Sequence, residues 1–197
     1  VFFLARILGA LYFINNIDDK DLVARSRRSL IGNSVLFLVF FLSFVIRTLL
    51  ADGYAVNPET GEIFMEPYKY LTNFIEMPVV LVLFLIGVVL VLFGIGKSLL
   101  KPKFDKGIWF TGIGTVLAVL ALLLVAGYNH TAYYPSTSDL QSSLRLANSC
   151  SSEFTLRVMF YVSFLVPFVL AYIFYAWRSI DIHKIDEKEM KDGGHSY

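Results

Sequence analysis

Residues 77–96 read MPVVLVLFLIGVVLVLFGIG, a run of twenty residues without a charged side chain. A transmembrane helix takes about 20 apolar residues, whereas a strand buried in a soluble protein ends after about eight. A backbone in lipid has to satisfy its hydrogen bonds internally, so the run is expected to be helical. Three more runs are long enough to cross a bilayer: residues 34–51, 108–128 and 155–177. The predicted fold is an all-α, polytopic transmembrane helix bundle.

The composition agrees with a membrane protein. Of the 197 residues, 56% are hydrophobic and 17% are charged, below the roughly 25% charged residues of soluble domains. A formal net charge of +1 argues against an electrostatic nucleic-acid binder, which is usually strongly basic. Because Cys150 is the single cysteine, the chain cannot form an internal disulfide framework or a cluster of thiolate metal ligands.

Basic residues predict the orientation of the spans. Lysines and arginines are concentrated in residues 15–33, in the segment after residue 96 and in residues 178–197, whereas residues 52–76 and 129–154 hold only Lys69 and Arg145. Positive charge stays on the cytoplasmic side. We therefore expect a cytoplasmic loop at 15–33, a four-helix transmembrane bundle over 34–177, periplasmic loops at 52–76 and 129–154, and a cytoplasmic tail at 178–197.

The opening segment, residues 1–14, is apolar but short. At 1.5 Å per residue, fourteen helical residues cover roughly 21 Å of a hydrocarbon core of roughly 30 Å. We interpret this segment as the end of a truncated transmembrane helix that something precedes. An interfacial or re-entrant helix is the alternative. Within the segment, Arg6 either snorkels toward the cytoplasmic side or pairs with an acid on an absent helix.

Local signals predict details of the helices. Pro78 suits a first helical turn, and Ser152 suits an N-cap before the last span. Residues 57–61, Asn-Pro-Glu-Thr-Gly, are typical of a turn. Pro167 lies inside the last span and is expected to kink it. Four glycines, at positions 87, 94, 112 and 114, indicate close packing of the middle two spans. The polar loop 129–154 is expected to form a short interfacial helix or a flap folded over the bundle.

Residues that could carry chemistry are scarce. His130, His183 and His195 fall outside the spans, and Met159 has no second haem ligand near it in the sequence. The spans hold no Asp or Glu for a proton relay, and Glu76 at a boundary fits a solvated helix-start carboxylate better than a relay. Asn129-His130-Thr131 matches the short glycosylation pattern, which is weak by itself. We therefore predict no catalytic, cofactor-binding or metal-ligating residue.

Three parts of the chain resemble a known family. VPFVLAY at residues 166–172, and Gly9-Ala10-Leu11-Tyr12 followed by Arg25, resemble motifs of subunit II of cytochrome bd-type quinol oxidases. The chain departs from the family at Leu8, where many members carry His or Gln, and at Arg145, where Thr is frequent. The outer-loop part of the resemblance comprises Pro135-Ser136, Ser143-Leu144-Arg145, Ala147-Asn148-Ser149, Ser151-Ser152, Thr155-Leu156 and Met159.

The resemblance covers essentially the whole chain and about the C-terminal half of the family's length. It implies a bacterial respiratory complex that oxidises quinol and reduces oxygen to water, with haems b and d in partner subunit I. Subunit II, which resembles subunit I in fold, would stabilise the heterodimer in the cytoplasmic membrane without binding haem in this part. No catalytic residue of the family maps onto the chain.

Two other functions stay open. A small transporter or channel module would need a polar or broken-helix path near mid-membrane. Pro167, Thr111 and Thr115 are the candidates for such a path, and solute flux in liposomes without a partner would favour it. A membrane scaffold outside respiration is the third reading, favoured if no co-purifying complex shows a haem spectrum.

Overall fold

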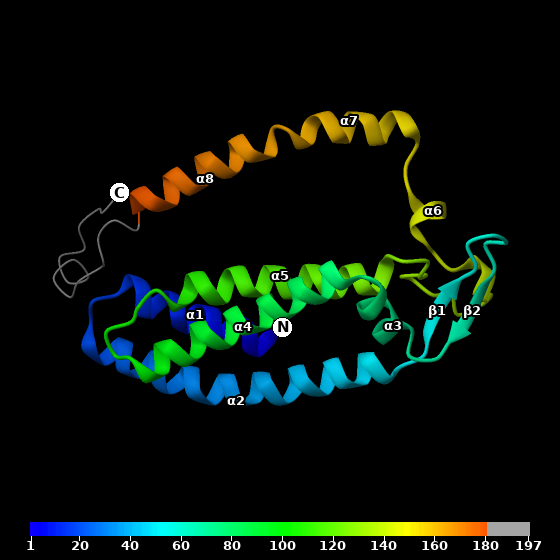
Figure 1. The fold of residues 1–197 in the computed structure, drawn as a ribbon. Helices are drawn as coiled ribbons and strands as arrows, with labels where there is room; N and C mark the ends of the chain where they lie inside the picture. Colours follow the sequence, from blue (N-terminus) through cyan, green and yellow to red (C-terminus); the bar gives the residue numbers. More distant parts are fainter. Residues whose placement is uncertain (181–197) are drawn as a thin grey trace.

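A computed structural model describes residues 1–180. Four helices pack side by side into a bundle, and a fifth, broken helix lies apart from them (Figure 1). Three helices of the bundle and the broken helix are long and apolar enough to cross a membrane, which confirms the predicted all-α membrane fold. The bundle consists of α1 (Phe2–Asn16), α2 (Lys20–Leu50), α4 (Pro78–Leu100) and α5 (Gly107–Gly127).

The predicted loop at residues 15–33 is wrong over most of its length, because α2 already begins at Lys20. Asp19 explains the early start, since its carboxylate accepts a hydrogen bond from the Leu22 amide at 2.7 Å and caps the helix. Leu30, within the first part of α2, is fully buried against α1 and α4. The charged side chains before residue 34 limit the apolar run to residues 34–51, but they do not end the helix.

The core between these helices lies near the basic residues. Ile7, Leu11 and Ile14 of α1 pack against Leu30 of α2 and Ile95 of α4. We call this side of the bundle the basic end and define it by residues 15–28 and 97–107. The α1 helix starts midway along α2 and runs to the basic end (Figure 1).

The opposite side, the hairpin end, holds the two longer connections. Strands β1 (Gly53–Val56) and β2 (Ile63–Glu66) pair antiparallel, with Gly53 opposite Glu66. The sequence predicted their turn but not the strands. Asn57 makes that turn, because its side-chain oxygen accepts from the Glu59 amide at 2.9 Å. The other elements here are α3 (Lys69–Glu76), the 3-10 turn η1 (Leu140–Ser142) and α6 (Leu146–Ser149).

The last span is two helices, α7 (Glu153–Ser163) and α8 (Val166–Ile180). The interruption directly precedes Pro167, which confirms the predicted kink, since proline has no amide to donate and its ring clashes with the preceding turn. The Ser152 hydroxyl caps α7 by accepting from the Thr155 amide at 3.4 Å, also as predicted. Pro78 occupies the first turn of α4.

Candidate functional site

The closest helix pair, α4 with α5, meets along small residues. A Cβ atom added to Gly87 would lie 2.6 Å from the backbone nitrogen of Ala118, and one added to Gly114 would lie 2.6 Å from the carbonyl oxygen of Gly87. Real Cβ atoms do not approach backbone so closely, so these two glycines set the separation of the helices. Gly94 belongs to the same seam, where Thr111 and Gly107 face it. Gly112 does not, since its added Cβ would meet nothing within 4 Å.

An arginine ties the helices together at the basic end. The Arg27 guanidinium donates to the carbonyl oxygens of Ser98 and Pro102, the latter at 2.8 Å. Ser98 is in the last turn of α4, whose final carbonyls have no partner within the helix and carry partial negative charge. Arg27 therefore fixes α2 to the end of α4. No local pattern in the sequence indicated this role, because the bonded groups are 71 or more residues apart.

At the hairpin end, the loop 129–154 folds onto the hairpin, whereas the sequence predicted a short interfacial helix or a flap folded over the bundle. The Gln141 side chain accepts from the Ile63 amide at 2.9 Å and donates to the Ile63 carbonyl at 2.8 Å. Thr131 bridges to Ala55 on the other strand. Both strands of the hairpin are thus held by the loop. We call this assembly, residues 53–76 with 129–149, the outer cap.

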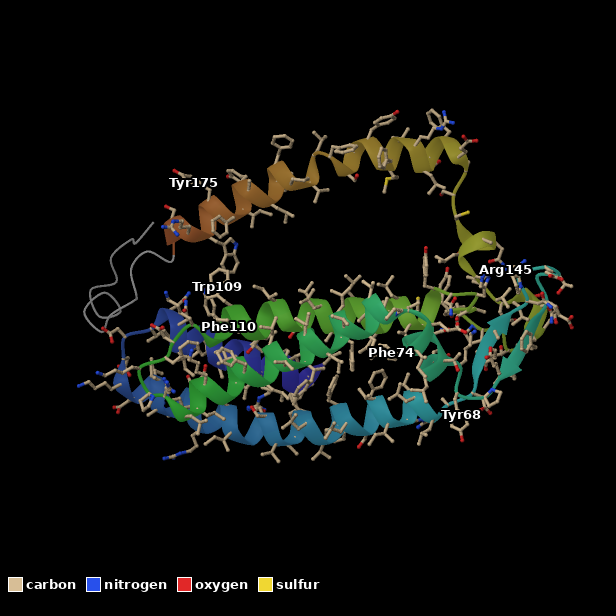
Figure 2. All side chains as sticks on the ribbon, in the orientation of Figure 1. Tyr68, Phe74, Trp109, Phe110, Arg145 and Tyr175 are labelled. Atoms are coloured by element: carbon tan, nitrogen blue, oxygen red, sulfur yellow. The ribbon has the colours of Figure 1, made fainter. Side chains whose placement is uncertain are left out.

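Arg145, the position where the chain departs from the family pattern, has a defined place in the outer cap. Its guanidinium donates to the Gly61 carbonyl at 2.7 Å, and Figure 2 shows it beside the hairpin. Gly61 has a φ of +73°, in the left-handed region that favours glycine. The charge therefore secures the hairpin turn to the second loop.

A buried amide joins the outer cap to the bundle. Asn73 of α3 is fully buried, and its side-chain nitrogen donates to the Val125 carbonyl at 2.9 Å and to the Thr131 hydroxyl at 2.9 Å. Its oxygen accepts from the Asn129 side chain at 3.1 Å. The Asn129 amide also donates to the Glu76 carboxylate. Glu76 is therefore a partner in a structural network, and the Asn129 side-chain nitrogen is hydrogen-bonded to Asn73 and Glu76.

One tyrosine of the outer cap, Tyr70, has a raised pKa. Burial raises the pKa of the Tyr70 hydroxyl, and the neighbouring Tyr54 hydroxyl raises it further. Both groups lie outside the membrane-length helices. A raised pKa keeps Tyr70 neutral over a wide pH range, which suits a half-buried side chain packed under the hairpin.

An apolar cavity of about 470 Å³ opens beside the first residues of α1. Thr115 is the one hydroxyl-bearing residue among those that line it. The cavity lies between α2, α4 and α5, next to the first residues of α1. Its lining includes Phe41 and Phe44 from α2, Val88 and Leu92 from α4, and Ala118 and Leu122 from α5.

The α7–α8 span presents a large apolar surface that the rest of residues 1–180 leaves almost entirely uncovered. Over the 27 residues from Glu153 to Ser179, the most apolar stretch has 0% of its residues buried. Figure 2 shows side chains such as Tyr175 projecting from α8, well away from the bundle. Toward the basic end, the Trp177 ring contacts Tyr12 of α1, with 6.4 Å between ring centroids. A helix this apolar and this exposed is a surface for binding lipid or protein.

The residues considered for metal or haem chemistry do not converge in the described part of the chain. Met159 is 63% exposed on α7, and His130 is in the loop after α5, with a positive φ of 52°. No group of three His, Cys, Asp or Glu close enough to hold a metal ion occurs within residues 1–180. His183 and His195 lie outside the described residues, as does most of the predicted cytoplasmic tail.

The fold defines a class, the multi-pass helical membrane proteins. The family model for cytochrome bd terminal oxidase subunit II matches residues 1–180, and the chain belongs to that family. It is 28% identical over 156 residues to the cytochrome bd-I ubiquinol oxidase subunit 2 of Escherichia coli strain K12, and equally to the proteins of that name from Escherichia coli O6:H1 and O157:H7. The alignment covers 78% of this chain and 39% of each relative, so the matched part spans well under half of their length. The resemblance seen in the sequence is confirmed.

Proposed function

We propose that this chain forms the haem-free, C-terminal part of the integral subunit II of a bacterial quinol oxidase. The complex would oxidise quinol and reduce oxygen to water in aerobic respiration, with haems b and d held by partner subunit I. Membership of the subunit II family and the similarity to ubiquinol oxidase subunits support this assignment. In this role the chain packs against subunit I, stabilises it and keeps water away from its redox centre.

The observation that carries the proposal is the exposure of α7–α8. An apolar helix of membrane length with 0% of its residues buried gains little from its own chain. Its surface is rich in aromatic side chains, including Phe164 at 58% and Phe168 at 74% exposure, and large rigid aromatics are typical anchors of protein interfaces. Subunit I is the partner that we assign to this surface.

The outer cap has a second part in the proposal. Hydrogen bonds from Gln141 and Arg145 give the cap a fixed shape over the hairpin end, and α7 starts directly after it. The cap therefore positions α7–α8 at a distance from the bundle (Figure 1). We assign the cap to the periplasmic face and the basic end to the cytoplasm, in accord with the positive charge at that end. The C-terminus is then cytoplasmic.

Residues 1–14 are, in this proposal, the cytoplasmic part of a membrane helix. The apolar cavity supports this assignment, because Val1, Phe3 and Leu4 line it together with apolar side chains of the membrane-length helices α2, α4 and α5.

Truncation of the α7–α8 surface tests the proposal in the complete, affinity-tagged oxidase complex. Phe164→Ala combined with Phe168→Ala removes two exposed rings while leaving the bundle core intact. Loss of an interface anchor typically costs about 2 kcal/mol or more, so haem recovered per mole of this chain should fall at least about tenfold. The measurement is the haem spectrum of the detergent-purified complex at equal amounts of this chain.

The matched control is Val39→Ala combined with Ile46→Ala, on α2. Both side chains are 56% exposed but belong to the bundle. This variant should recover haem at the level of the unaltered protein. Deletion of residues 129–154 should also release subunit I, because α7–α8 then loses its anchor. Undiminished haem in both the phenylalanine variant and the deletion would contradict the proposal.

A further inference from the structure

Arg6 stands out because it is a charged residue on an apolar helix face. α1 buries Ile7, Leu11 and Ile14 against the bundle, and Arg6 lies about 100° around the helix from Ile7 on an exposed side. Eight residues separate Arg6 from Ile14, which corresponds to about 12 Å along the helix. If α1 is membrane-embedded, Arg6 lies well inside the hydrocarbon region. A charge at that depth is costly unless it is hydrated or paired.

The direction of the side chain argues against snorkelling. The Arg6 guanidinium carbon lies 5.7 Å from the ring centroid of Phe2. Phe2 is one turn before Arg6, farther from the basic end. Helical side chains lean toward the N-terminus of their helix, which for α1 is the direction of the membrane centre. To reach water at the basic end, the arginine would have to reverse this lean and pass Phe13.

A carboxylate that could pair with Arg6 is missing from the described residues. The ion pairs within residues 1–180 are Lys69 with Glu66 and Arg157 with Glu153, both away from α1. α1 itself, α4 and α5 contain no acidic residue. A counter-charge at this depth therefore has to come from outside the described part of the chain.

The same face is shaped for close approach by another helix. Ala5 and Gly9 are four residues apart and flank Arg6. A Cβ added to Gly9 would meet nothing within 4 Å, so packing within the bundle does not account for this glycine. Small residues at this spacing let two membrane helices come close together. Gly9 thus differs from Gly114, whose hydrogen is in contact with the neighbouring helix.

We propose that this face of α1 binds a transmembrane helix of the partner subunit whose Asp or Glu side chain pairs with Arg6. The inference rests on the proposed function, and it specifies the chemistry of the contact. Tyr12, six residues along α1 and about 120° around it from Arg6, touches Trp177 of α8. A partner that packs along α8 therefore also lies close to α1. In lipid, a carboxylate opposite a guanidinium neutralises both charges and gives the pair a fixed register.

The test uses the complete oxidase complex, purified through a tag on this chain. Arg6→Glu places two carboxylates together and should lower recovered haem at least about tenfold. Because an added carboxylate can itself hinder membrane insertion, Arg6→Met is the second variant. It should leave the amount of this chain in the membrane unchanged and still reduce recovered haem about fivefold or more. Arg6→Lys should retain most of the haem.

Selection for restored respiration in the Arg6→Glu strain identifies the partner residue. Suppressors should change an intramembrane Asp or Glu of subunit I to Lys, Arg or a neutral residue. The control is Arg28→Met, which removes an exposed cation at the basic end and should leave haem recovery unchanged. Normal haem recovery with Arg6→Met, or suppressors that map to another part of this polypeptide, would overturn the inference. Absence of haem from the unaltered complex would instead contradict the proposed function.

Discussion

The pair α4–α5 and the span α7–α8 are both apolar and of membrane length, yet they pack in opposite ways. In α4, 33% of the most apolar stretch is buried, compared with 0% in α7–α8. The difference follows from side-chain size. The seam between α4 and α5 contains Gly87, Gly94, Gly107 and Gly114, whereas α7–α8 has no glycine.

This comparison shows what apolarity does and does not specify in a membrane. Lipid is as apolar as a leucine side chain, so hydrophobicity alone does not bring two helices together. Close backbone approach increases dispersion contacts, and small residues permit it. Aromatic side chains on α7–α8 keep other backbones at a distance and present broad rings to a partner. The first surface serves folding of the chain, and the second is available for assembly.

The largest difference in the free energy of unfolding is expected between alanine substitutions of two phenylalanines. Phe74 is 4% exposed and packs on Phe84, Val80 and Val125, whereas Phe168 on α8 is 74% exposed. Phe74→Ala should lower the free energy of unfolding by about 3 kcal/mol, because it leaves a cavity. Phe168→Ala should change it by less than about 0.5 kcal/mol. Unfolding of the purified chain in mild detergent, followed by circular dichroism, measures both; equal effects would refute the contrast.

A smaller effect is expected along the glycine seam. Gly114→Ala inserts a methyl group against the Gly87 carbonyl and should destabilise by about 1–3 kcal/mol, as overpacking does. Gly112→Ala, two residues away on the same helix, meets open space and should be neutral or stabilising by about 0.5 kcal/mol, because alanine favours the helix. Thermal unfolding of the two variants side by side decides the matter. Equal melting temperatures would show that the seam does not set the helix separation.

The smallest effect concerns pH at the outer cap. Since the pKa of Tyr70 is raised in the folded chain, folding favours the neutral hydroxyl. That contribution is complete below the ordinary tyrosine pKa of about 10 and is lost as pH rises through the raised value. Tyr70→Phe should therefore flatten the loss of stability at alkaline pH, and Tyr68→Phe, at a residue 51% exposed, should not. The measurements are an absorbance titration of the tyrosine hydroxyls and unfolding at a series of alkaline pH values. The expectation fails if Tyr70→Phe loses stability with pH as steeply as the unaltered chain.

Much of the helix pattern could be predicted because single-residue signals are local. The uncharged run at residues 77–96, Pro78 at a helix start and Ser152 at an N-cap each act on neighbouring backbone. The start of α2 was missed because the amphipathic stretch from Lys20 resembles a charged loop when only hydropathy is considered. Its cap, Asp19, was visible in the sequence and would have located it.

The contacts that give the candidate site its shape could not be predicted. Arg27, Asn73 and Gln141 each bond groups more than 50 residues away in the chain. Their identities are common for surface residues, and nothing in their neighbours marks them as connectors between distant segments. Arg145 looked like a departure from the family pattern, and the structure shows a bond to the Gly61 carbonyl that uses its charge.

By itself, the sequence determined that this chain forms membrane-length helices, where proline interrupts the last of them, and to which family its motifs belong. These properties depend on the free energy of placing each residue in lipid and on hydrogen bonds within a turn. Only the tertiary structure decided which helices touch, which glycines are needed, and that, within residues 1–180, α7–α8 has no buried stretch and Arg6 of α1 is exposed. Those facts depend on the distances between residues far apart in the chain, and they exist only once the backbone has folded.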